Sequence, residues 1–167
     1  QMLGALSAWL EKAQAEMPDR ADALLSARIA PDMFPLATQI RFACVQALAG
    51  MYRMRDEAFP PEIDALLNEA RGAGEHPGTM ADALVRIAET VAQVQALATG
   101  MDEPDPERPI AHALPMGMIF DLSARQYARD WAIPQFYFHV MAAYAILRGE
   151  GVGLGKADYV AHMFPYL

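Results

Sequence analysis

The sequence is poor in cysteine, in long apolar runs and in signal-like segments, and each shortage excludes a class of protein. Cys44 is the single cysteine among 167 residues, so no disulfide can form within the chain, and we expect a cytoplasmic protein. The longest apolar run, Phe136 to Leu147, contains His139 and is shorter than the roughly 20 residues of a membrane span. The chain opens inside a helical pattern without a signal peptide, so we expect further residues before Gln1.

Clustered positive charge is also missing. The net charge is −8, and Arg53 with Arg55 forms only an isolated basic pair. Because nucleic acids and anionic membranes are bound through clusters of Lys and Arg, we expect neither as a partner. The hydrophobic fraction of 54% excludes global disorder, and the length fits one domain over residues 1–167.

Apolar residues at helical spacing predict an all-α protein. The predicted bundle helices cover residues 2–17, 33–52, 80–98 and 124–148. Asp32 is expected to cap the second of them, and Thr79 with Asp82 forms a capping-box pattern before the third. Gly100 is expected to end that third helix.

Two short alternating segments precede the last helix and predict a small β-hairpin. Ile110, His112 and Leu114 would share one face of its first strand, and the turn would lie at 115–117. The last helix begins after a possible cap at Ser123, and Pro134 is expected to kink it or divide it in two. Beyond Pro134 this helix is apolar on every side, which predicts a place in the middle of the bundle.

The chemistry-bearing residues do not form a complete site motif. His139 has alanines at the following positions, 142 and 143, so no pair of metal ligands shares a helical face, and we expect no metal and no cofactor. The glycine-rich stretch from Gly149 to Gly155 matches neither the phosphate-binding nor the dinucleotide-binding pattern. The simplest interpretation of His139 is a buried neutral imidazole that forms a hydrogen bond with a glutamine, a tyrosine or a backbone carbonyl.

Several motifs together resemble the DUF1993 family within the DinB/YfiT-like superfamily of metalloenzymes. They are Met33-Phe34-Pro35-Leu36 with Gln39, Phe136-Tyr137-Phe138-His139, Ala143-Tyr144, Leu147-Arg148, and Gly151-Val152 with Gly155-Lys156-x-Asp158-Tyr159. The resemblance implies a four-helix bundle in up-down-down-up order, often paired as a homodimer. It also implies three metal-binding histidines, but here the second bundle helix has none and the fourth has only His139.

Three hypotheses about function follow. The first is a non-metal module that binds a small apolar ligand or a second copy of itself; the residues predicted to bind are Gln39, Gln46, Tyr137, His139, Tyr144 and Arg148. The second is an enzyme in which His139 acts as general acid or base, since an unperturbed imidazole has a pKa of about 6.5. The third is a residual metal site that combines His139 with carboxylates.

Overall fold

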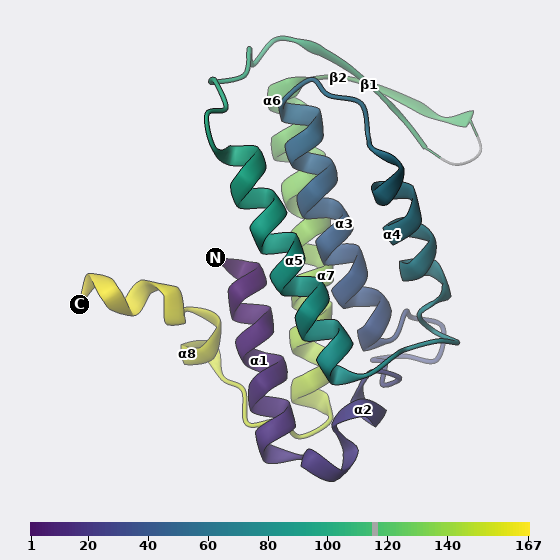
Figure 1. The fold of residues 1–167 in the computed structure, drawn as a ribbon, viewed down its shortest axis with the longest axis vertical. Coiled ribbons are helices and arrows are strands. Elements are labelled where there is room, and N and C mark those ends of the chain that lie inside the picture. Colours follow the sequence, from purple (N-terminus) through teal and green to yellow (C-terminus); the bar gives the residue numbers. More distant parts are fainter. Residues whose placement is uncertain (115–116) are drawn as a thin grey trace.

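Four long helices form a bundle in the computed structural model, which describes residues 1–114 and 117–167 (Figure 1). They are α1 (Met2–Glu16), α3 (Leu36–Met54), α5 (Met80–Ala98) and α7 (Ile133–Gly149). Helices α3 and α5 run in one direction, and α1 and α7 run in the other, which confirms the predicted up-down-down-up order. Both α1 and α3 pack against α5 and α7, so each bundle helix has two neighbours within the bundle.

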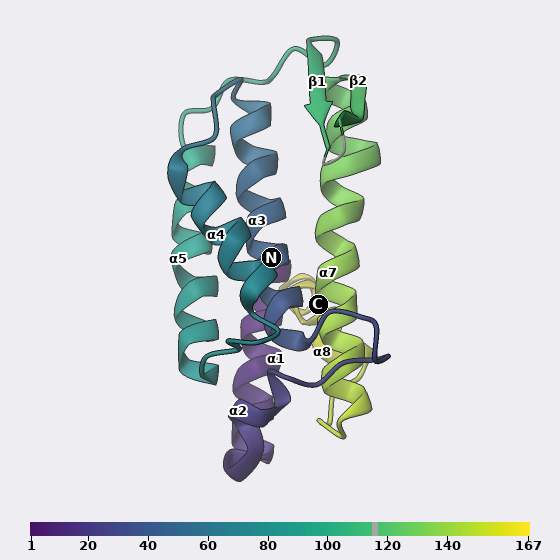
Figure 2. The same ribbon diagram turned by 90° about the vertical axis from the view of Figure 1, so that its right-hand side faces the viewer.

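Shorter elements connect the bundle helices. Between α1 and α3 lie η1 (Pro18–Arg20) and α2 (Ala21–Leu24), and α4 (Pro61–Gly72) returns the chain to the start of α5. Figure 2 shows α4 lying over α3 on the outside of the bundle. After α7 the chain ends with α8 (Lys156–Tyr159) and η4 (Ala161–Tyr166). No helix in the described part of the chain is long and apolar enough to cross a membrane.

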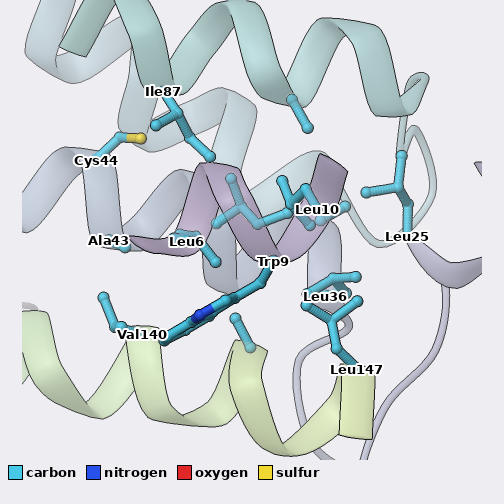
Figure 3. Close-up of a cluster of buried hydrophobic side chains, with 14 of the residues drawn as sticks. Leu6, Trp9, Leu10, Leu25, Leu36, Ala43, Cys44, Ile87, Val140 and Leu147 are labelled. Atoms are coloured by element: carbon cyan, nitrogen blue, oxygen red, sulfur yellow. The ribbon is translucent and has the colours of Figure 1, made fainter. Parts of the chain in front are cut away.

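The core lies where the apolar stripes of the four helices meet (Figure 3). Trp9 of α1 points toward Val140 of α7, and its indole Nε1 donates a hydrogen bond to the carbonyl of Asp158 at 3.2 Å. Tyr159 stacks on the same indole, so these contacts hold the tail after α7 against α1. The fully buried large side chains of this core include Leu6, Leu10, Leu24, Leu25, Leu36, Ile40, Ile87 and Leu147.

The helices begin where the sequence predicts in the two places where a capping box precedes them. Thr79 and Asp82 form the predicted capping box, and Ser123 caps its helix with Gln126 in the same way. The expected cap at Asp32 is wrong, because α3 begins only at Leu36 after an extended Pro35 with no side-chain cap. The proline ring disfavours helical geometry at the preceding residue, so the helix cannot extend back through Phe34.

The last predicted helix, 124–148, has an irregular first half. It consists of α6 (Ala124–Gln126), the π-helical segment η3 (Tyr127–Ala132) and α7. Pro134 lies in the first turn of α7. The π-helical segment ends at Ala132, two residues before Pro134. The proline has no N–H, so a backbone carbonyl in the preceding turn lacks its usual donor.

The prediction that α7 lies in the middle of the bundle is wrong. Its buried side carries His139, Val140, Ala143 and Leu147, but Phe138 is 58% exposed and Met141 is 40% exposed. In a bundle of four helices, α7 contacts α1 and α3 on one side only, and within the described chain no helix covers the other side. Because α7 is apolar on every side, the side that no other helix covers exposes apolar side chains to solvent.

The predicted hairpin is confirmed as β1 (Pro109–Ala113) and β2 (Ile119–Ser123), which pair antiparallel with Ile110 opposite Leu122. It lies at the end of the bundle above α7 (Figure 2). Ile110 packs with Ala124 and Tyr127 in a second small core, so the hairpin is attached to the π-helical segment. The expected turn at 115 and 116 lies outside the described residues.

Candidate functional site

A buried polar contact joins α3 to α7. Gln39 lies in the first turn of α3, and its amide Nε2 donates a hydrogen bond to the carbonyl of Phe34 at 3.2 Å. Its Oε1 is therefore free to accept, and it lies 2.8 Å from Nδ1 of His139. His139 Nδ1 must carry the proton in this pair, which leaves Nε2 of the ring as an acceptor.

Aromatic rings surround the imidazole. The His139 ring stacks on Phe42 with centroids 5.0 Å apart, and Phe42 lies 5.5 Å from Phe34. On the other side Phe138 meets the imidazole edge-on at 5.3 Å. We call this set of rings the aromatic cluster; it consists of Phe34, Phe42, Phe138 and His139. The cluster brings together the two sequence motifs around Phe34 and His139.

The electrostatics of the cluster keep the imidazole neutral. His139 is only 7% exposed, and loss of solvation lowers its pKa to about 4. Its hydrogen-bond partner Gln39 does not titrate, and Phe42 and Phe138 supply no charge. At neutral pH the ring can donate through Nδ1 and accept through Nε2, but it is a weak base.

The other predicted site residues lie apart from His139. Tyr144 packs against Trp9 with centroids 5.2 Å apart, on the side of α1, and Arg148 donates a hydrogen bond to the carbonyl of Leu154. Tyr137 is partly exposed and contacts Phe136. At about 100° per residue, positions 137 and 144 point away from position 139 on the helix, so these side chains cannot converge on the imidazole.

Gln46 belongs to a different feature, an apolar groove of about 320 Å³ between α3, α5 and the start of α7. Gly50 and Ala132 face each other within it, and a Cβ atom at Gly50 would lie 3.6 Å from the Cβ of Ala132. The other lining residues are Ala47, Met51, Met54, Val94, Ala128, Ile133 and Phe136.

The outer side of α7 carries a stripe that sequence reasoning missed. On α7 its residues follow one another at alternating steps of four and three: Pro134, Phe138, Met141, Ala145 and Arg148. Trp131 of η3 precedes them by three residues, and its ring packs against His112 and Phe120 of the hairpin. We call the five residues on α7 the α7 face. Apolar residues at this spacing are typical of the contact line between two paired helices. The pattern is present in the sequence and could have predicted a partner for this side of the helix. Of the five, Arg148 alone is charged.

The remaining candidates for chemistry are dispersed. His76 is exposed in a loop, His162 lies in η4, and His112 on β1 packs against Trp131 at 4.5 Å. Burial, and then the nearby Arg53, lowers the pKa of His112. Burial raises the pKa of Cys44 to about 11, so its thiol is inert. Within residues 1–114 and 117–167, no group of three or more His, Cys, Asp or Glu side chains is placed to hold a metal ion.

Comparisons with known proteins agree with this architecture. The family described as "Domain of unknown function (DUF1993)" matches residues 1–160. Among solved structures, a DinB family member protein from Shewanella denitrificans is similar over 95% of this chain and 84% of its own, with 30% sequence identity and a TM-score of 0.67. A comparison with curated proteins gives no match.

Proposed function

The chain belongs to the DUF1993 family, and from this premise we propose that it is a self-association module that forms a homodimer through the α7 face. The observation that supports this proposal is the exposure of large apolar side chains along one side of one helix. Phe138 and Met141 lie at its centre and are both exposed. Burying a side chain of this size in an interface contributes about 1.5–3 kcal/mol.

Phe34 adds a further exposed aromatic side chain, which is linked to Phe138 through the rings of Phe42 and His139. Phe34 is 52% exposed and belongs to the aromatic cluster with Phe42 and Phe138. The hydrogen bonds from His139 to Gln39 and from Gln39 to the Phe34 carbonyl hold this apolar surface in place. A rigid apolar surface of contiguous residues is typical of a protein interface, whereas a scattered apolar residue is not.

Charge favours a second copy as the partner. Two molecules that each carry a net charge of −8 repel one another, and the repulsion is smallest where they meet through a surface with no negative charge. The α7 face is such a surface, since Arg148 at its end is positive and the other four residues are uncharged.

An acid–base role for His139 has less support. Its pKa of about 4 leaves it unprotonated at neutral pH, and its partner Gln39 cannot relay a proton. A general acid or base works best with a pKa near the operating pH. The geometry instead suits a fixed, neutral ring that supports the surface around Phe138.

Sedimentation analysis of three proteins tests the proposal. The unmodified chain should sediment as a dimer, and Phe138→Glu should sediment as a monomer because a carboxylate would be buried in the interface. Val85→Glu is the matched control, because Val85 is 57% exposed on α5 and distant from the α7 face, so this variant should remain dimeric.

Circular dichroism should show that all three proteins keep the same helix content. Met141→Glu provides a second variant of the α7 face in case Phe138→Glu folds poorly. A monomeric unmodified chain at every concentration measured would refute the proposal, as would equal effects of the Phe138 and Val85 substitutions.

A further inference from the structure

We infer that the apolar groove between α3, α5 and α7 binds a helix that continues α1 on the N-terminal side of Gln1. Its occupant is a segment of the same chain, in line with α1 and apolar on one side. The inference goes beyond the proposed homodimer and does not rest on it. Phe136 in the groove lies two positions before Phe138 of the α7 face, which is about 200° around the helix.

Helix α1 stops short of the end of the bundle that carries the hairpin. It has 15 residues, whereas α3 and α5 have 19 each. Figures 1 and 2 show that α1 begins well below the hairpin end, while α3, α5 and α7 continue beyond it. Since α1 packs against both α5 and α7, the space that it would occupy above Met2 lies between the same two helices.

The groove starts at the first turn of α1. A second hollow of about 320 Å³ is lined by Met2 and Leu3 of α1 together with side chains of α3, α5 and α7. It shares Ala47, Val94 and Phe136 with the groove. The two hollows therefore form one continuous trough, which leads from the start of α1 toward the hairpin end of the bundle.

The lining of the trough suits the apolar side of a helix. Gln46 is the one polar residue of the groove itself, and no charged side chain lines either hollow. An extended segment would leave its backbone N–H and C=O groups without partners here, whereas a helix pairs them internally. Gly50 and Ala132 leave room for a helix to approach closely, and Met51 can adapt to its side chains.

The buried side of α1 sets the position of the apolar residues on the added helix. Leu3, Leu6 and Leu10 are buried at steps of three and four, so a helix that continues this phase faces the same interior. The α3 residues of the groove extend from Gln46 to Met54. This span corresponds to about 12 Å along a helix axis, or about eight residues beyond the start of α1.

Two extended forms of the chain test the inference. The first carries three helical turns before Gln1, with leucines at the positions that continue the buried stripe of α1. The second is the matched control, in which the same residues are reordered so that the leucines lie on the opposite side. Each form, and the unextended chain, carries Val94→Cys as a reporter, because Val94 is half-buried and lines both hollows. The native Cys44 will not interfere, because it is buried and its pKa is about 11.

The rate at which a thiol reagent labels position 94 should fall about tenfold or more in the first form and stay within about twofold in the control. Circular dichroism should show added helix in the first form, and its urea midpoint should rise above that of the unextended chain. A neutral naphthylamine dye should bind the unextended chain and the control but not the first form.

Equal labelling in all three proteins would overturn the inference. Protection of the unextended chain that grows with protein concentration would also overturn it and assign the groove to a second copy. Dye that still binds the first form at position 94 would assign the groove to a small apolar ligand instead. Sedimentation of the same proteins tests the homodimer separately: a monomer would refute the proposed function and leave the helix site intact.

Discussion

Nδ1 of His139 lies 2.8 Å from Oε1 of Gln39, although the two residues are 100 positions apart in the sequence. This single contact joins the start of α3 to the first half of α7 inside a mostly apolar interior. Because Gln39 is also bonded to the carbonyl of Phe34, the contact links the loop before α3 to the α7 face. The contact therefore couples the interior of the bundle to the proposed interface.

Replacing Gln39 with leucine should lower the free energy of unfolding by about 1–3 kcal/mol, because the N–H at Nδ1 of His139 would be buried without an acceptor. Urea unfolding at neutral pH measures the change. Gln46→Leu is the matched control: Gln46 is half-buried beside the apolar groove, and we expect a change within about 0.5 kcal/mol. Equal losses in the two variants would show that the hydrogen bond does not carry the effect.

The depressed pKa of His139 predicts that stability falls in mild acid. The unfolded chain takes up a proton near pH 6.5, whereas the folded imidazole resists protonation down to a pKa of about 4. This group therefore contributes stability above pH 6.5 that is lost as the pH falls from 6.5 toward 4. At about pH 5 the loss should be roughly 2 kcal/mol relative to about pH 7.5.

His139→Gln provides the reference for that measurement, since it removes this titration and keeps a polar group beside Gln39. His112, whose pKa is also lowered, titrates in both proteins, so its contribution cancels in the comparison. The stability difference between the two proteins should shrink or reverse as the pH falls. A difference that stays constant across this range would contradict the assignment of a buried neutral imidazole.

The parts of the fold that were predictable depend on local signals. The capping pair Thr79 and Asp82 is a local sequence pattern that predicts the start of α5. The alternation of apolar and other residues around Ile110 predicts the hairpin in the same way. The exposure of each helix face depends instead on how the helices pack together. Apolar side chains on every side of α7 do not reveal which side meets other helices, so the exposure of Phe138 followed only from the placement of α1 and α3.

The site was predictable in part for a related reason. His139 was recognised as the interior polar group and glutamine as one of its possible partners, but sequence alone could not pair it with Gln39 across 100 residues. Tyr144 and Arg148 were grouped with it by nearness in the sequence, although helical phase places them elsewhere. Their ligand-binding role, and that of Gln46 and Tyr137, stays a prediction.

Two glycines in different backbone conformations give a final pair of predictions with opposite signs. Gly50 lies within α3, and a Cβ atom there would lie 3.6 Å from the Cβ of Ala132, an ordinary contact. Gly50→Ala should therefore raise the free energy of unfolding by about 0.5–1 kcal/mol, because alanine loses less conformational freedom in a helix.

Gly78 has a φ of +73°, and a Cβ atom there would approach Oδ2 of Asp82 at 3.2 Å and Nη2 of Arg41 at 3.3 Å. Gly78→Ala should cost about 1–2 kcal/mol from the left-handed backbone alone. Crowding of the Thr79–Asp82 capping box should add to this loss. Thermal and urea unfolding of the two variants beside the unmodified chain measure both effects. Destabilisation by Gly50→Ala would mean that α3 and the π-helical segment pack more closely than these contacts allow, and a neutral Gly78→Ala would mean that the turn before α5 can relax.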